Sequence, residues 1–222
     1  MKQKQYLLLR LIEMLLGVSI TAIGLSCMIK SGLGQTSITS FTQNVTMITE
    51  MKSGTVLILF FLACTGIQIL ILRRDFQKMQ LLQVILALVQ GKIVNLICYD
   101  MPLVCDYYPE TYIGQWLFVL LGIFFCSYGV AVLFKAELVK NPFEELAMVL
   151  SKRFHMEFSV FRTRIDIFFM MVSLFMILLF HLDFTTVREG TWVSMLLLGR
   201  SMKYTFPMAE ITSLYYRRTR MN

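Results

Sequence analysis

Long apolar runs alternate with short polar segments along most of this chain. Each strong run holds close to the roughly 20 apolar residues that a helix needs to cross a ~30 Å hydrocarbon core. Lipid offers no partner to unpaired backbone groups, so such spans have to be helices. We therefore predict an all-α, polytopic membrane protein with about six transmembrane helices. Their approximate bounds are Leu11–Ile29, Thr55–Leu72, Leu81–Cys98, Trp116–Phe134, Ile165–Leu182 and Trp192–Phe206, the last interrupted by Arg200 and Lys203.

The same pattern recurs within the chain, because residues 17–92 return in degenerate form as residues 122–200. Gly17, Gly24 and Lys30 each have a counterpart 105 positions later, and the pair Phe60-Phe61 has one 108 positions later. Each copy holds three spans, and an odd number makes the copies antiparallel, as in inverted-repeat transporters. The expected organisation is a first repeat over 1–99, a loop over 100–115, a second repeat over 116–209 and a basic tail over 210–222.

Each copy also carries a polar segment after its first span, namely Gln35–Met51 and Asn141–Phe154. Gly32 and Gly34 allow a sharp break before the first segment, while Asn141 and Pro142 are suited to start a helix in the second. We expect a short broken helix in each copy. The sequence leaves open whether it is re-entrant, with its N-terminus turned toward a substrate, or interfacial.

Composition and charge fit this description. The chain is 57% hydrophobic and 16% charged, and its net charge of +7 comes from Lys and Arg at span ends and in the tail, while residues 99–115 contain neither. This distribution sets membrane orientation and does not indicate a nucleic-acid partner. The lipid bilayer is the expected partner, and the charge distribution places both termini in the cytoplasm. The first span is expected to remain uncleaved.

Candidate chemistry centres on two cations within apolar runs, Lys92 and Arg200, which are equivalent in the two copies. A charge at such depth is costly, so it is expected to face a cavity or a partner, and two of them would favour an anion; snorkelling to the membrane surface is the alternative. Polar groups on the third span either join this site or bond neighbouring helices. The proposed substrate-binding set is Lys92, Arg200, Gly32, Gly34, Thr36, Ser37, Asn141, Gln90 and Asn95.

The sequence carries little that would indicate an enzyme. His155 and His181 lie at span ends, and no metal-ligand spacing, nucleophile motif or phosphate-binding loop is present. We therefore expect no catalytic activity, no metal and no cofactor. Cys98 and Cys105 flank one polar loop and either pair there or remain free thiols.

The run GVSITAIGLSCMIKSGLGQTS, residues 17–37, resembles the opening of the YczE/YyaS/YitT family of bacterial integral membrane proteins. The likeness rests on Lys30, Gly32, Leu33, Gly34 and Thr36, with Ser37 in place of a proline. LGIFFCSYGVAVLFKAELVKNPFEEL resembles the family's second half. Membership would imply a multi-pass protein of the bacterial inner membrane, and it implies little about a substrate.

These observations predict a small permease for a small solute, with an anion favoured, whose site lies between the two repeats. The alternative is a membrane regulatory or accessory protein that docks partners through its basic 135–164 region, with no solute path. The substrate-binding subunit of a vitamin importer also has about six spans, but the internal repeat argues against it. The sequence leaves open a homo-oligomer or a cytoplasmic protein partner.

Overall fold

The computed structural model describes residues 2–102 and 104–212, and side chains from residue 7 to residue 210. The part of the basic tail beyond residue 212 lies outside the described residues. The described residues form eight α-helices and three short 3₁₀ or π turns, so the all-α prediction is confirmed. The helices are α1 (Lys2–Ser31), α2 (Ser37–Thr49), α3 (Ser53–Leu72), α4 (Leu82–Asn95), α5 (Tyr112–Lys135), α6 (Pro142–Arg153), α7 (Phe158–Phe180) and α8 (Glu189–Thr212).

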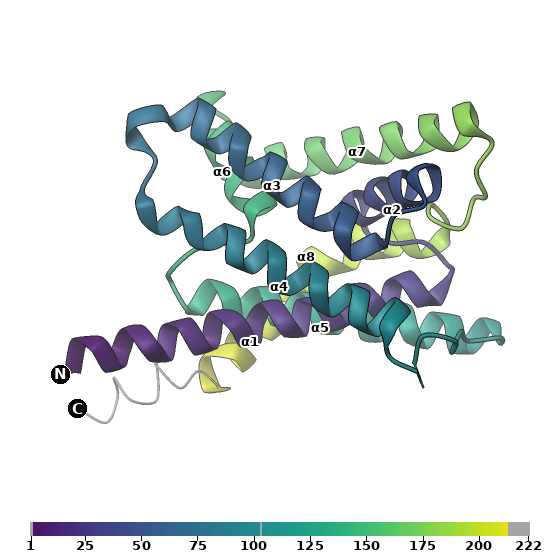
Figure 1. Ribbon diagram of the computed structural model, residues 1–222, viewed down its shortest axis with the longest axis horizontal. Coiled ribbons are helices and arrows are strands. Elements are labelled where there is room, and N and C mark those ends of the chain that lie inside the picture. Colours follow the sequence, from purple (N-terminus) through teal and green to yellow (C-terminus); the bar gives the residue numbers. More distant parts are fainter. Residues whose placement is uncertain (1, 103, 213–222) are drawn as a thin grey trace.

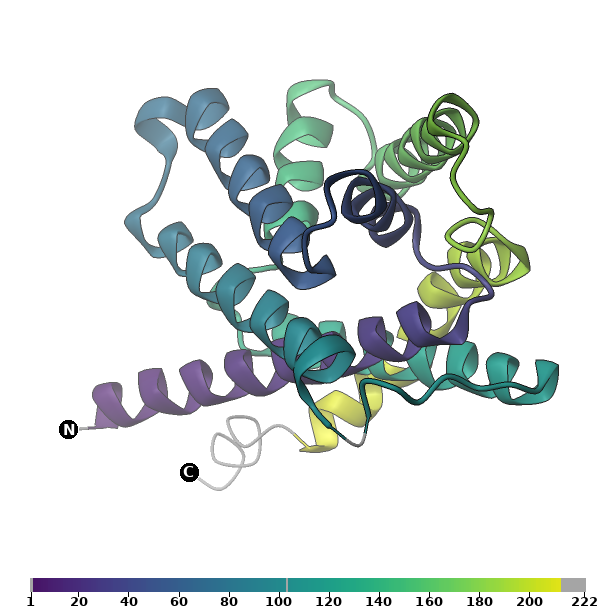
Figure 2. The ribbon, with the colours of Figure 1, turned by 45° about the vertical axis from the view of Figure 1, so that its right-hand side comes forward.

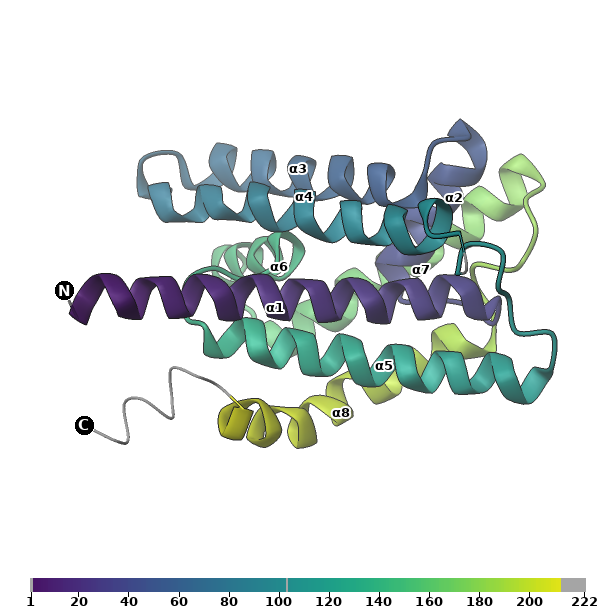
Figure 3. The same ribbon diagram turned by 60° about the horizontal axis from the view of Figure 1, so that its bottom comes forward.

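Six of these helices are long and run roughly along one direction, while α2 and α6 are short and lie among them (Figures 1 and 3). Among the described residues, five helical stretches are long and apolar enough to cross a membrane, which makes this a multi-pass membrane protein in contact with lipid. They comprise residues 7–31 of α1 and the whole of α3, α4, α5 and α7. The sixth expected span, α8, is as long but carries the exposed cations Arg200 and Lys203.

The centre of the fold is the antiparallel pair α1 and α5, which lie side by side in Figures 1 and 3. Gly17 faces Gly129 and Gly24 faces Gly122, and a Cβ atom on Gly24 would lie 2.6 Å from the Cys126 nitrogen. Small residues at these points let two helices approach closely, as is common in membrane bundles. Around this pair, α4 packs on α1, α8 packs on α5, and α3 packs against α4.

Two ends of the bundle can be distinguished. At the near end α1 begins and α3 and α5 finish, and at the far end α1 finishes and α5 begins (Figure 3). α8 lies alongside α5 over its length, since the Gly190 nitrogen bonds Leu33 at the far end and Glu210 pairs with Lys135 at 3.2 Å near the other. The short helices occupy opposite ends, α2 toward the far end and α6 toward the near end.

Lys30 anchors the loop at the far end. Its ammonium group is buried at the end of α1 and donates to the carbonyl oxygens of Val104 (2.6 Å), Cys105 (2.9 Å) and Tyr107 (3.3 Å). The ring of Tyr108 lies over it, with the ring centroid 4.5 Å from the ammonium nitrogen, and partial burial raises the pKa of that phenol. Cys98 and Cys105 are both free thiols.

Candidate functional site

α2 begins inside the bundle. Its first residue, Ser37, donates to Asp166 of α7, and further along Asn44 donates to the Ser173 carbonyl oxygen at 2.9 Å. From the first contact to the second, the residue number increases along both helices, so α2 and α7 run in the same direction. Asp166 lies eight residues into α7, about 12 Å from its start at 1.5 Å per residue. The N-terminus of α2, capped by Thr36, therefore points toward the middle of the bundle (Figure 2).

α6 also begins inside the bundle. The Asn141 side chain caps its first turn and donates to Gln90 Oε1 at 3.1 Å, and Gln68 Nε2 donates to the Pro142 carbonyl oxygen at 2.7 Å. Gln90 lies within α4 and Gln68 within α3, so both partners come from the first half of the chain. The expectation of a short helix after a break is thus confirmed in both halves.

An aromatic cluster lies between the two short helices. Phe41 of α2, Phe143 of α6, Phe60 of α3 and Phe169 of α7 meet with ring centroids 5.3 to 6.1 Å apart. Such tilted and edge-on pairs add to the stabilisation from burial alone. The packed rings therefore join α2, α3, α6 and α7 inside the bundle.

Beside this cluster is an ionic triad of Arg162, Glu144 and Asp166. The Arg162 guanidinium lies 3.2 Å from Glu144 and pairs with Asp166, which also accepts the bond from Ser37. It stacks over the ring of Phe143 with its central carbon 4.7 Å from the ring centroid. Each of the three side chains is only about one-fifth exposed. The triad thus joins α2, α6 and α7 where the two short helices begin.

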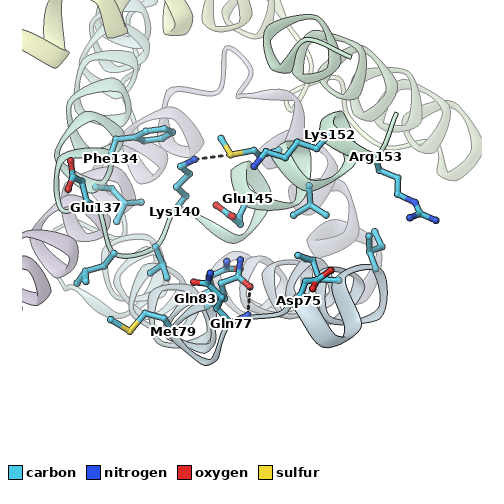
Figure 4. A pocket seen from close by; sticks show the side chains of 18 residues that line it. Asp75, Gln77, Met79, Gln83, Phe134, Glu137, Lys140, Glu145, Lys152 and Arg153 are labelled. Carbon is cyan, nitrogen blue, oxygen red and sulfur yellow. Dashed lines mark hydrogen bonds between the residues drawn. The ribbon is translucent and has the colours of Figure 1, made fainter. Parts of the chain in front are cut away.

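A cavity of 710 Å³ lies at the near end. One wall is the end of α3 with the connector 73–81, and the other is the link 136–141 with α6 (Figure 4). Gln83 lines the cavity although its side chain is fully buried, and its Nε2 group has no hydrogen-bond partner among the described residues. The volume is within the ~300–1,000 Å³ typical of small-molecule sites.

The corresponding segments at the far end are held together. Residues 32–36 follow α1 as residues 136–141 follow α5, and residues 181–188 with the first turn of α8 follow α7 as the connector 73–81 with the first turn of α4 follows α3. Arg188 Nη1 donates to the Gly32 carbonyl oxygen at 3.2 Å, the Gly190 nitrogen to Leu33 at 2.8 Å, and the Gln35 nitrogen to Thr191 Oγ1 at 3.1 Å. We call these three bonds the far-end seal.

The close approach at the far-end seal depends on Gly34. Its φ of 102° lies in the region that favours glycine, and a Cβ atom there would be 2.7 Å from the Arg188 nitrogen. Of the sequence-predicted site residues, Gly32 and Gly34 thus belong to this seal, whereas Thr36 and Ser37 start α2.

The remaining predicted site residues do not all lie together. Gln90 and Asn141 meet. Asn95 instead accepts a bond from the Gly54 nitrogen at 2.8 Å and donates to Thr55, so it ties α4 to α3. Lys92 and Arg200 have exposed side chains, line no part of the cavity, and form no ion pair with a described residue. The structure therefore does not bring these two cations together.

The triad and Gln83 were absent from the proposed set. One signal for Arg162 and Asp166 was available, because Arg162, Asp166, Phe169, Ser173 and Ile177 recur at the spacing of one helix face. Among the described residues, His, Cys, Asp and Glu do not gather in a group of three that could hold a metal ion.

Comparison with known families places this chain. A family model described as "Family of unknown function (DUF6198)" matches residues 8–207. The chain belongs to this family. No curated protein and no solved structure matches it. The DUF6198 match covers α2 to α7 completely and most of α1 and α8, so the cavity and the far-end seal lie within the matched region.

Proposed function

We propose that this DUF6198 protein is a small permease that carries a small solute across the membrane by alternating access. The observation that carries the proposal is the contrast between its two ends. The near end has a 710 Å³ cavity where the far end has a hydrogen-bonded seal between the corresponding segments. A permease needs two such gates, one open while the other is closed.

The proposal includes an inverted repeat, which contacts within the α1–α5 pair support. Gly17 faces Gly129 and Gly24 faces Gly122. Because positions 105 apart correspond, each of these contacts is the counterpart of the other. The Cys126 thiol lies 3.7 Å from the carbonyl oxygen of Thr21, its own counterpart. Self-complementary contacts of this kind are expected across a two-fold axis.

Backbone conformation supports the same repeat. Left-handed φ angles occur at Gly32 (65°) and, 105 positions later, at Glu137 (51°). They occur also at Glu50 (57°) and His155 (54°), and, 108 positions apart, at Arg73 (47°) and His181 (51°). Residues other than glycine adopt a positive φ rarely. Arg73 and His181 share only the sign of φ, since ψ is −102° at Arg73 and 40° at His181, so the first two pairs carry the support for a common ancestral path of the chain.

Packing between the copies has the same pattern, since α2 packs on α7 and its counterpart α6 packs on α3. We further propose that α8 is the sixth crossing, counterpart of α4, and that the basic N-terminus lies in the cytoplasm. The near-end cavity then opens inward. The resemblance to the YczE/YyaS/YitT family would place the protein in a bacterial inner membrane.

A labelling experiment tests alternating access without knowledge of the solute. In a variant with its five cysteines replaced by serine, one cysteine is placed at Met79 in the cavity or at Leu33, whose side chain is buried beside the far-end seal and which takes part in the seal only through its backbone. We expect Met79→Cys to react with a membrane-impermeant maleimide from the cytoplasmic side and Leu33→Cys to be protected. Adding Arg188→Ala should raise labelling at 33 from outside and lower it at 79. Independent changes at the two positions would refute the proposal.

The regulatory alternative also has an observation in its favour. The aromatic cluster packs inside the bundle, and Phe154 is 61% exposed beside the exposed cations Lys152 and Arg153 at the end of α6. Such a surface suits a protein partner. A panel of labelled solutes distinguishes the two functions, because a docking protein gives no uptake into proteoliposomes for any of them.

A further inference from the structure

The cavity wall formed by α6 presents a defined set of side chains. Glu145, Met148, Val149 and Lys152 follow the spacing of one helix face, and all four line the cavity. Lys140, from the link before α6, has its ammonium nitrogen 2.9 Å from the sulfur of Met148. Lys152 brings a second ammonium group to the same wall, which also carries the carboxylate of Glu145 (Figure 4).

None of these three charges is neutralised within the described part of the chain. Lys140 contacts the Met148 sulfur and the ring of Phe134, whose centroid is 5.3 Å from its nitrogen, and neither is an anion. Lys152 and Glu145 form no ion pair with a described residue. Charges that face a cavity without partners are available to a ligand.

Gln83 adds an independent sign of a ligand. Its side chain is 0% exposed, and its oxygen accepts a bond from Thr65 at 3.4 Å while its nitrogen has no partner among the residues that the structure describes. A buried donor without an acceptor is costly, so natural structures rarely leave one. Because Gln83 lines the cavity, a solute with an oxygen acceptor can satisfy it.

We propose that the cavity binds a small solute that carries both a carboxylate and an amine, as an amino acid does. This inference rests on the proposed permease and names its solute class. The carboxylate binds between Lys140 and Lys152, the amine faces Glu145, and an oxygen of the solute accepts from Gln83. With Arg153, Asp75 and Glu137 included, three cationic and three anionic side chains line the cavity, so a simple carboxylate or a simple amine meets like charge there as well as opposite charge.

Binding to the full-length protein in nanodiscs tests this class. The twenty L-amino acids are screened by thermal shift, and the tightest is compared with two analogues, one lacking the amine and one lacking the carboxylate. We expect each analogue to bind at least tenfold more weakly. Lys140→Gln and Lys152→Gln should each weaken the amino acid at least tenfold, while Lys92→Gln, at an exposed site outside the cavity, should leave its affinity unchanged.

Glu145→Gln provides the most specific result. It should weaken binding of the amino acid and strengthen binding of the analogue without the amine, a reversal that misfolding does not produce. Absence of binding by all twenty amino acids, or equal affinity for the amine-free analogue, would overturn the inference. Binding as expected without uptake into proteoliposomes would instead refute the permease, and uptake with a different selectivity would refute only the solute class.

Discussion

Alanine at Gly24 is the sharpest test of how the two halves of the chain are held together. A Cβ atom at this position would lie 2.6 Å from the Cys126 nitrogen and 2.8 Å from the Gly122 oxygen, both backbone atoms of α5. The counterpart Gly129 is equally crowded, with 2.6 Å to both the Thr21 nitrogen and the Gly17 oxygen. Neither clash can be relieved by turning a side chain, so the helices have to separate.

The distance by which α1 and α5 have to separate sets the expected loss of stability. Ordinary contacts of a Cβ atom begin near 3.4 Å, so α1 and α5 have to move apart by most of an ångström along their shared surface. Overpacking of this kind costs about 1–3 kcal/mol, and we expect about 2 kcal/mol for Gly24→Ala and the same for Gly129→Ala. One separation accommodates both alanines, so the double variant should lose clearly less than the sum.

Gly66 is a matched control, because it lies within the apolar helix α3 with no atom near its missing side chain. Gly66→Ala should be neutral or stabilise by up to about 1 kcal/mol through helix propensity. The assay is reversible unfolding in mixed dodecylmaltoside and SDS micelles, followed by circular dichroism. The reasoning fails if Gly24→Ala behaves like Gly66→Ala, or if the two crowded substitutions are additive.

Three further predictions concern the far-end seal, the ionic triad and Lys30. Gly34→Ala should open the far-end seal and speed amide hydrogen exchange in residues 32–36 and 186–191. Gly32→Ala is the control, because a Cβ atom at Gly32 has space around it. It should cost about 1–2 kcal/mol of stability for its left-handed φ and leave hydrogen exchange in those residues unchanged. Arg162→Met should destabilise by about 3–5 kcal/mol in the same micelle assay, because the carboxylates of Glu144 and Asp166 lose their cation. Neutralising both carboxylates in the Arg162→Met variant should restore most of the lost stability. Lys30→Met should lower stability by about 2–3 kcal/mol, because it leaves three carbonyl oxygens without their donor. Lys135, at the position equivalent to Lys30, is partly exposed, so Lys135→Met should lower stability by under about 1 kcal/mol.

The helices were predictable from the sequence because the apolar runs are long and their caps are explicit. The Asn141-Pro142 start of α6 and the break at Gly32 to Gly34 lie where the local chemistry places them. The last span was the weakest prediction, since Arg200 and Lys203 lower its hydropathy. Its helix forms nevertheless and packs on α5, which is a tertiary contact that no local pattern records.

The rotational setting of each helix was harder to predict, and it decided the position of Lys92. Gly91 is buried where α3 and α4 touch, close to Gly54 and Ile58. The next residue points about 100° away around the helix, which turns Lys92 outward. The Arg162–Glu144 pair of the triad could not be predicted for a related reason, because it forms only once α6 packs against α7.

The difference between the two ends does not come from different helix layouts. Glu137 lacks the glycine of its counterpart Gly32 yet keeps a left-handed φ, so the chain turns similarly after α1 and after α5. Gly34 is the exception, since its counterpart Val139 has no positive φ and is buried in an apolar cluster near the cavity. A side chain at 139 excludes the close backbone approach that closes the far end around Gly34. If the protein works as the proposed permease, the near end therefore has to close by a different contact, and its two gates are expected to differ in strength.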